Sequence, residues 1–257
     1  MLVLDSQGPR DSHSAPIIHG LHERLAGRRD ARLAVEHLSL AEHGETAEHI
    51  ATIADVIEHR YGDERIAAIV TIGDPALRLA MLLRDDALGS APIVFLEVAL
   101  TSRDAGDLPN AAGYVVRHEF ERLLELIAEQ RPNARTLHVL DDLTWRSDPA
   151  RRDFADAISR VELPFALNVI EEFDSTRPSN ALAALDPDDA ALLLSLTIDS
   201  GAADETETVA AIAEASGAPV YGGYERMVGL GLIGGYLKDL RELGDEAGRR
   251  GAALLDG

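Results

Sequence analysis

Short apolar runs alternate with amphipathic stretches along the whole sequence, and this alternation limits the possible folds more than any other feature. The runs are continuous rather than alternating in polarity, which is typical of strands buried on both faces of a parallel sheet. The stretches between them carry apolar residues at helical spacing, for example at Ile50, Ile53 and Ile57. Strands and helices in regular alternation predict an α/β protein built from parallel, right-handed units. The predicted strands are Leu2–Leu4, Leu33–Leu38, Ala67–Ile72, Ile93–Leu96, Gly113–Val116, Thr136–Leu140, Ala166–Ile170, Ala191–Leu196 and Pro219–Tyr221.

A polar stretch with glycine and proline, Thr101–Gly113, divides these predicted strands into two series. Four predicted strands come before it and five come after it. A chain of 257 residues is long enough for two lobes of ordinary size. We therefore expect two similar sheets rather than one very wide sheet.

The composition argues against several classes of protein. The formal net charge is −21, from 45 acidic and 24 basic residues, whereas a nucleic-acid surface needs basic patches that replace counterions. The same charge disfavours an anionic membrane surface, and it is typical of a highly soluble or extracytoplasmic protein. The chain has no cysteine, which excludes disulfides, thiolate nucleophiles and cysteine-based metal sites.

The sequence contains no segment that predicts direct insertion into a membrane. Its longest apolar runs have the length of strands, far below the roughly 20 residues that a membrane-spanning helix needs. No signal peptide is visible, because Met1 leads directly into the first predicted strand. We expect either a cytoplasmic protein or a chain trimmed to its folded part.

One glycine-rich motif matches the spacing of a dinucleotide-binding fingerprint. Gly229, Gly231 and Gly234 spell G-x-G-x-x-G within the stretch GLGLIGG. A fingerprint of this kind requires a following strand with an acidic residue about 20 residues further on, and only one helical stretch follows here. We interpret the motif as a strand whose glycines allow close approach of another backbone. The last helix carries Gly244, Gly248 and Gly251, which predicts a second closely packed face.

Few patterns in the sequence indicate catalysis. The chain has no phosphate-binding loop, no HExxH and no GxSxG motif. His19 and His22 lie at i and i+3 on a predicted helix, where surface positions are the favoured interpretation and a zinc site is the alternative. We therefore predict no catalytic residue, no metal and no cofactor.

The candidate ligand-binding residues share one predicted position, the carboxyl end of a parallel strand, where ligands bind in open α/β sheets. Each also has a structural alternative: Asp74 fits a helix cap, Asp141 fits a turn, and Trp145 fits a cover over the edge of the core. The cluster of carboxylates favours a ligand with an amino group or another cationic part. The candidates are Ser6, Gln7, Gly73, Asp74, Glu97, Asp141, Trp145, Thr197, Asp199, Tyr224 and Glu225.

Several blocks, taken in order, resemble the substrate-binding proteins of ABC transporters and the related sensor domains of bacterial signalling proteins. The block APVYGGYERMVGLGLIGGYLKDLRELGDEAGRRGAALLDG resembles the C-terminal signature of that family. LVLDSQGP resembles its first strand and ligand loop, IAAIVTIGDPAL its third strand, and APIVFLEVAL its fourth strand. GYVVRHEFERLLELIAEQRPNARTLHVLDD resembles the crossover into its second lobe. The resemblance covers essentially the whole chain.

The resemblance implies a type I periplasmic-binding fold, with two Rossmann-like lobes joined by hinge strands. The first lobe would comprise residues 1–114 and 226–257, and the second lobe residues 115–225. The strand Gly229–Leu237 and the last helix would then rejoin the first lobe. Members of the family more often carry a Ser-Tyr pair where this chain has DSQGP, which weakens the case for an aromatic ligand.

The function implied by the resemblance is non-catalytic binding of a small polar, amino-acid-like ligand between the lobes. The setting would be extracytoplasmic, and the partner a membrane permease, a sensor kinase or a cyclase-type output. One alternative is a nucleotide- or sugar-phosphate-dependent enzyme. Another is the effector-binding core of a transcription regulator, which shares the two-lobe fold.

Overall fold

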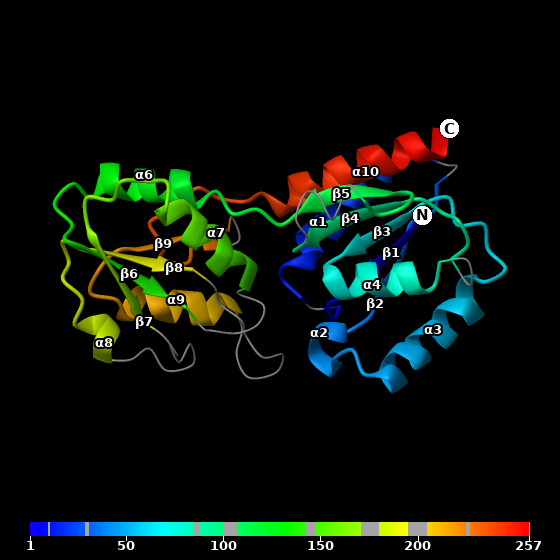
Figure 1. Ribbon diagram of the computed structural model, residues 1–257, viewed down its shortest axis with the longest axis horizontal. Helices are drawn as coiled ribbons and strands as arrows, with labels where there is room; N and C mark the ends of the chain where they lie inside the picture. Colours follow the sequence, from blue (N-terminus) through cyan, green and yellow to red (C-terminus); the bar gives the residue numbers. More distant parts are fainter. Residues whose placement is uncertain are drawn as a thin grey trace. The chain divides into compact units, whose positions relative to one another are not determined.

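The computed structural model describes residues 1–9, 11–28, 31–84, 88–99, 107–141, 148–170, 180–194, 205–224 and 227–256. The chain forms two compact units, each built around its own parallel sheet, as Figure 1 shows. The first unit comprises Met1–Val116 and Leu240–Gly257, and the second comprises Arg117–Asp239. The predicted α/β class and the two parallel sheets are therefore confirmed.

The first unit has a five-stranded parallel sheet in the order β2-β1-β3-β4-β5. Its strands are β1 (Leu2–Asp5), β2 (Ala34–His37), β3 (Ile69–Ile72), β4 (Ile93–Val98) and β5 (Ala111–Val115). Its helices are α1 (Ser14–Leu25), α2 (Leu40–His43), α3 (Ala47–Tyr61), α4 (Asp74–Leu82) and α10 (Leu240–Asp256).

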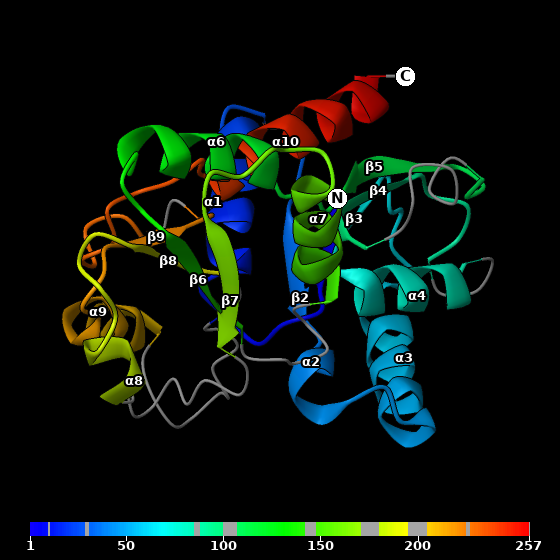
Figure 2. The same ribbon diagram turned by 60° about the vertical axis from the view of Figure 1, so that its left-hand side comes forward.

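Side chains alternate between the two faces of this sheet, so each face has its own core. Leu4 packs in a cluster with residues of α3 and α4, whereas Val3 packs with Ile17 of α1 and Leu240 of α10. Figure 2 shows these two pairs of helices on opposite sides of the sheet. The continuous apolar runs of β1, β3 and β4 follow from this double cover, because all the residues of these three strands are buried.

The second unit has a four-stranded parallel sheet in the order β7-β6-β8-β9. Its strands are β6 (Thr136–Leu140), β7 (Ala166–Ile170), β8 (Ala190–Leu193) and β9 (Val220–Gly222). Its helices are α6 (Phe120–Gln130), α7 (Asp148–Ile158), α8 (Asn180–Ala183) and α9 (Glu205–Ala215). Residues of α6 and α7 pack in one core cluster, and residues of α8 and α9 in another (Figure 1).

Glycines bring α1 and α10 into close contact. A Cβ atom at Gly244 would lie 2.0 Å from the carbonyl oxygen of Ile17, and one at Gly248 would lie 2.8 Å from Cβ of Arg24. On the other side of the contact, a Cβ at Gly20 would lie 2.1 Å from the carbonyl oxygen of Arg241. The predicted small face of the last helix is confirmed by these distances.

The segment that contains GLGLIGG differs from its prediction. It is not a strand, because residues 227–239 form turns with two isolated bridges, Tyr221 to Gly234 and Tyr224 to Lys238. Gly229, Gly231 and Gly234 have φ of 85°, 95° and 131°, values that L side chains rarely adopt and that interrupt an extended strand.

The boundaries of the units also differ from the predicted ones. Residues 227–239 belong to the second unit, so the chain returns to the first unit only at Leu240. The predicted boundary at residue 226 was too early, because the bridges and hydrogen bonds of this segment run to β9 and to Gly223. The first crossing lies between Val116 and Arg117 rather than after Tyr114.

Within the described residues, none of the helices combines the length and the apolar character that crossing a membrane requires.

Candidate functional site

In the first unit, Ser6 connects the carboxyl ends of β1 and β3. Its hydroxyl donates to the carbonyl oxygen of Ile72 at 2.7 Å and accepts from the backbone N–H of Ala76 at 2.9 Å. Gly73 has φ of 86°, and a Cβ there would lie 2.8 Å from the Ser6 hydroxyl. The buried hydroxyl of Ser6 thus holds the first turn of α4 against β1. Ser6 and Gly73 are both among the candidates from the sequence.

Asp74 and Gln7 extend this set of contacts to the neighbouring strands. The Asp74 carboxylate accepts from the backbone N–H of Ala99, just after β4, with Oδ2 at 3.0 Å. Gln7 donates its backbone N–H to Asp5 Oδ1 at 3.2 Å, and its carbonyl oxygen accepts from Ser39 N–H after β2. Asp74 is the first residue of α4 and Gly73 the N-cap, so the capping interpretation of Asp74 was wrong.

Glu97 lies at an irregularity in β4. The pairing of β4 with β5 shifts register between Phe95 and Val98, and Glu97 has φ of 53°. Its largely buried carboxylate binds His13, with Nε2 and Oε2 3.0 Å apart. Bulges and left-handed non-glycine residues cost free energy and occur preferentially near functional sites.

A second histidine–carboxylate pair lies at the same edge of the sheet, on residues that the sequence analysis did not select. His37 Nδ1 lies 2.8 Å from Oδ2 of Asp5, whose side chain is fully buried. Burial raises the pKa of the Asp5 carboxyl, and hydrogen bonds from Ser14, Gln7 and His37 oppose that rise. The only signal in the sequence was an acidic residue ending an otherwise apolar strand.

In the second unit, Asp141 follows β6 and is buried against α7. Arg151 of α7 lies with its Nε 3.1 Å from Oδ2 of Asp141. A buried carboxylate paired with a guanidinium is compensated in charge. The candidate acid of this unit therefore already has a cationic partner on α7.

Tyr224 is the first of three polar side chains that contact one another in series, and the last of them, Asp153, lies on α7. Its hydroxyl lies 2.9 Å from Nε2 of His118, whose Nδ1 lies 2.9 Å from Oδ2 of Asp153. Burial raises the pKa of the Asp153 carboxyl, but hydrogen bonds from the ring and backbone of His118 outweigh it and hold that pKa below its usual value. His118 comes directly after the first crossing between the units, so these contacts fix Tyr224 relative to that crossing.

Four of the predicted site residues lie outside the described part of the chain: Trp145, Thr197, Asp199 and Glu225. Ser6, Gln7, Gly73, Asp74 and Glu97 gather at one edge of the first sheet, and Asp141 and Tyr224 both connect to α7 in the second unit. Among the described residues, no group of three or more histidine or acidic side chains is arranged to hold a metal ion.

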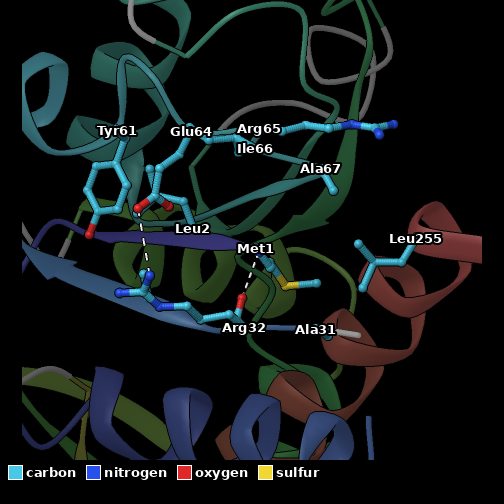
Figure 3. A pocket seen from close by; sticks show the side chains of 11 residues that line it. Met1, Leu2, Ala31, Arg32, Tyr61, Glu64, Arg65, Ile66, Ala67 and Leu255 are labelled. Atoms are coloured by element: carbon cyan, nitrogen blue, oxygen red, sulfur yellow. Dashed lines mark hydrogen bonds and ion pairs between the residues drawn. The ribbon is translucent and has the colours of Figure 1, made fainter. Parts of the chain in front are cut away.

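A depression of about 200 Å³ lies at the opposite, amino-terminal edge of the first sheet (Figure 3). Its lining includes Leu2, Arg32, Tyr61, Glu64 and Leu255. Two of its charged side chains, Arg32 and Glu64, lie 3.6 Å apart and are largely exposed. An exposed ion pair of this kind contributes little to stability, and the strand ends at the carboxyl edge remain the candidate site.

Comparisons with known proteins show which known structures share this fold. No protein-family model matches the sequence, and no curated protein matches it. Among solved structures, an ABC domain from Streptococcus pneumonia in complex with L-Trp has a TM-score of 0.64 and 19% identity, over 100% of this chain and 84% of that chain. A ligand-free, open substrate-binding protein with adhesive properties from Clostridium difficile has a TM-score of 0.62 and 18% identity, over 100% and 85%.

A transcription regulator matches the same fold. The Lac repressor bound to ONPG has a TM-score of 0.62 and 13% identity, over 100% of this chain and 75% of that chain. These similarities, together with two parallel sheets in two units, define the fold as type I periplasmic-binding-protein-like. Substrate-binding proteins and a repressor share this fold, so the function has to be inferred from the residues of the site.

Proposed function

We propose that this chain is a non-catalytic, small-molecule-binding domain that holds a polar, amino-acid-like ligand between its two units. The observation that carries the proposal is the set of polar side chains at the carboxyl ends of β1, β3 and β4, each fixed by contacts with neighbouring elements. Ligands of open α/β sheets bind at this edge, and prepared polar groups reduce the cost of ordering a site on binding.

The charge of this edge favours a ligand with a cationic part. Asp5, Asp74 and Glu97 contribute carboxylates, and the first turn of α4 already contains Asp74. An anionic ligand at the α4 N-terminus would meet that negative charge instead of open backbone N–H groups. An amino acid or a small amine fits this edge better than a phosphate ester does.

The proposed mechanism is closure of the two units on the ligand. Ser6, Gln7, Gly73, Asp74 and Glu97 contribute from the first unit. Asp141, Trp145, Thr197, Asp199, Tyr224 and Glu225 contribute from the second. Contacts that form only in the closed state shift the equilibrium towards closure. The closed form then engages a membrane permease or a sensor kinase or cyclase output in an extracytoplasmic setting.

A thermal-shift screen tests the proposal. We expect at least one compound among the L-amino acids and small amines to raise the melting temperature, because a ligand that binds only the folded state stabilises it. The same screen includes NAD, NADP, ATP and sugar phosphates. A shift with one of these, and none with the amino acids and amines, would support the alternative of a nucleotide- or sugar-phosphate-dependent enzyme.

The effector-binding core of a transcription regulator is a second candidate, favoured by the similarity to the Lac repressor. The two candidates differ in cellular location. Fractionation of the native host, with detection of this chain by antibody, distinguishes them, because a substrate-binding or sensor domain lies outside the cytoplasmic membrane and a repressor core lies in the cytoplasm.

A further inference from the structure

We propose that His37 is a ligand-contacting residue of the first unit, held in place by Asp5, and that its Nε2 atom accepts a hydrogen bond from an amino or hydroxyl group of the ligand. The inference rests on the proposed function, because it assigns the chemistry of one part of the same strand edge. Neither residue was among the candidates that the sequence indicated.

The two side chains meet because of the sheet register. Asp5 is the last residue of β1 and pairs with His37, the last residue of β2. Asp5 lies two residues after Val3, and therefore on the face that α1 covers. Ser14, the first residue of α1, adds a side-chain hydrogen bond to the same carboxylate. The Asp5 carboxylate is thus held from β2, from α1 and from the loop after β1 at once.

An acid at this position departs from the apolar pattern of the sheet. On the other side of β1, the residue in register with Asp5 is Ile72 of β3, a buried apolar residue. A buried carboxylate is costly unless it is paired and hydrogen-bonded, and replacing such pairs by apolar residues is often neutral or stabilising. Sites where a sequence departs from the pattern that stability favours are expected to be functional or strained sites.

The contact with Asp5 determines what His37 offers to a ligand. A carboxylate accepts from Nδ1, so the neutral ring carries its proton there and Nε2 is left as an acceptor. Within the described residues, Nδ1 to Asp5 is the hydrogen bond that the His37 ring makes. The side chain is 28% exposed, so solvent molecules reach part of the ring. A neutral imidazole held in this way accepts from a ligand N–H or O–H.

The groups around His37 come from β1, from the start of α1 and from its own strand. Asp5 faces it from β1, and the start of α1 contributes the uncharged Ser14 hydroxyl. The neighbouring Glu36 binds Arg60 and Tyr61 of α3, on the opposite face of the sheet. Asp5 is thus the charged group in contact with the His37 ring, and an amino or hydroxyl donor of the ligand complements its Nε2 atom.

His37→Asn and His59→Asn are the matched variants for the test. The asparagine amide nitrogen occupies the place of Nδ1, so it keeps the donor to Asp5 but lacks the second ring nitrogen. His59 is an exposed histidine of α3 and provides the control. The probes are the standard L-amino acids and small amines, titrated by calorimetry at neutral pH.

We expect His59→Asn to bind a probe with the affinity of wild type. We expect His37→Asn to bind the same probe about tenfold more weakly than wild type. Equal affinity in wild type and His37→Asn would overturn the inference. If no probe binds wild type, the proposed function itself fails, and the inference fails with it.

A measurement without ligand tests the positioning role of Asp5 separately. The imidazole ¹⁵N shifts of His37 report which ring nitrogen carries the proton. We expect the Nδ1–H form in wild type and a mixture of both tautomers in Asp5→Asn, with the fold intact by circular dichroism. A mixture of tautomers already present in wild type would contradict the assignment of Asp5, whatever the probes show.

Discussion

Positive φ angles occur at or near the carboxyl ends of three strands of the first unit, next to the residues that form the candidate site. Ser39 after β2 has φ of 48°, Gly73 after β3 has φ of 86°, and Glu97 in β4 has φ of 53°. Such conformations cost roughly 1–3 kcal/mol for residues other than glycine. They lie at the strand edge favoured for ligand binding. This position agrees with a site in which function requires a particular backbone geometry at some cost in stability.

The sequence indicated part of this arrangement, and the reason is local. Ser6, Asp74 and Glu97 were selected because they end or follow apolar runs, which is a property of neighbouring residues along the chain. His13 and His37 were missed because their partners are distant in sequence: Glu97 for His13, and Asp5 for His37. Only strand register and helix placement bring those pairs together.

The buried Asp5 carboxylate predicts how stability depends on pH. The folded state holds a proton on Asp5 more tightly than the unfolded chain, in which the pKa is 3.8. The stability that this group contributes is therefore complete below pH 3.8 and lost as the pH rises through the raised folded-state pKa. We expect Asp5→Asn to gain stability relative to wild type as the pH rises through this window.

Urea unfolding between the acid range and neutral pH measures that difference. Repeating the comparison in a His37→Asn background removes the imidazole partner of Asp5 and keeps the burial of its carboxyl. A difference between variant and wild type that stays constant with pH would show that Asp5 has no raised pKa in the folded state.

Asp153 predicts the opposite dependence on pH. Its pKa is lowered by His118, so its contribution is present above the unfolded value of 3.8 and lost as the pH falls through the lowered folded-state value. We expect Asp153→Asn to lower the free energy of unfolding by about 1 kcal/mol at neutral pH, since its partly exposed carboxylate is screened by solvent. Asp156→Asn on the same helix is the control, because its side chain is 73% exposed.

The test of Asp153 is urea unfolding of both variants at several pH values. The loss in Asp153→Asn should shrink in strongly acidic solution, and Asp156→Asn should stay close to wild type throughout. An equal loss in both variants would mean that the hydrogen bonds between Asp153 and His118 do not stabilise the second unit.

At the scale of elements, glycine positions determine which segments approach closely. A Cβ at Gly235 would lie 1.9 Å from the carbonyl oxygen of Gly222, whereas Gly229 and Gly234 have open space and positive φ. The close approach predicted from GLGLIGG thus occurs most strongly at Gly235, outside the G-x-G-x-x-G spacing. The segment was mistaken for a strand because an apolar run does not reveal left-handed glycines.

The contact between α1 and α10 predicts a strong effect of one methyl group. Gly244→Ala places a carbon against the backbone of Ile17, and neither backbone can move without disturbing its helix. We expect a loss of about 1–3 kcal/mol in the free energy of unfolding, despite the better helix propensity of alanine.

Gly27→Ala, at the end of α1, is the matched control for that substitution. No atom lies within 4 Å of the added carbon, so its effect should stay within about 1 kcal/mol. Chemical denaturation of both variants is the measurement. A Gly244→Ala protein as stable as Gly27→Ala would show that the two helices do not pack as closely as described.

The segment of residues 227–239 gives a second test at this scale. Gly235→Ala should disturb its contact with β9 and lower stability by about 1–3 kcal/mol, because the added carbon meets a carbonyl oxygen. Gly223→Ala, with nothing within 4 Å of the added carbon, should remain close to wild type. Hydrogen exchange of residues 220–238 should increase only in Gly235→Ala; equal exchange in both variants would contradict the contact.

At the scale of the whole molecule, the alternation of apolar runs and amphipathic stretches was sufficient to predict the α/β class and two parallel sheets. The point of return to the first unit was not predictable in the same way. Residues 227–239 follow β9 and stay with it through backbone hydrogen bonds, and such contacts leave no pattern in composition. The assignment of ligand and partner is likewise not contained in the fold, which hosts more than one function.

The central claim is that a small polar molecule binds at the carboxyl ends of the strands in both units. A crystal structure with the amino acid or amine that gives the largest thermal shift tests it most directly. We predict ligand density in contact with Ser6, Asp74 or His37 of the first unit and with the Asp141 or Tyr224 edge of the second. Density confined to the depression at the amino-terminal edge, near Arg32 and Leu255, would contradict the account.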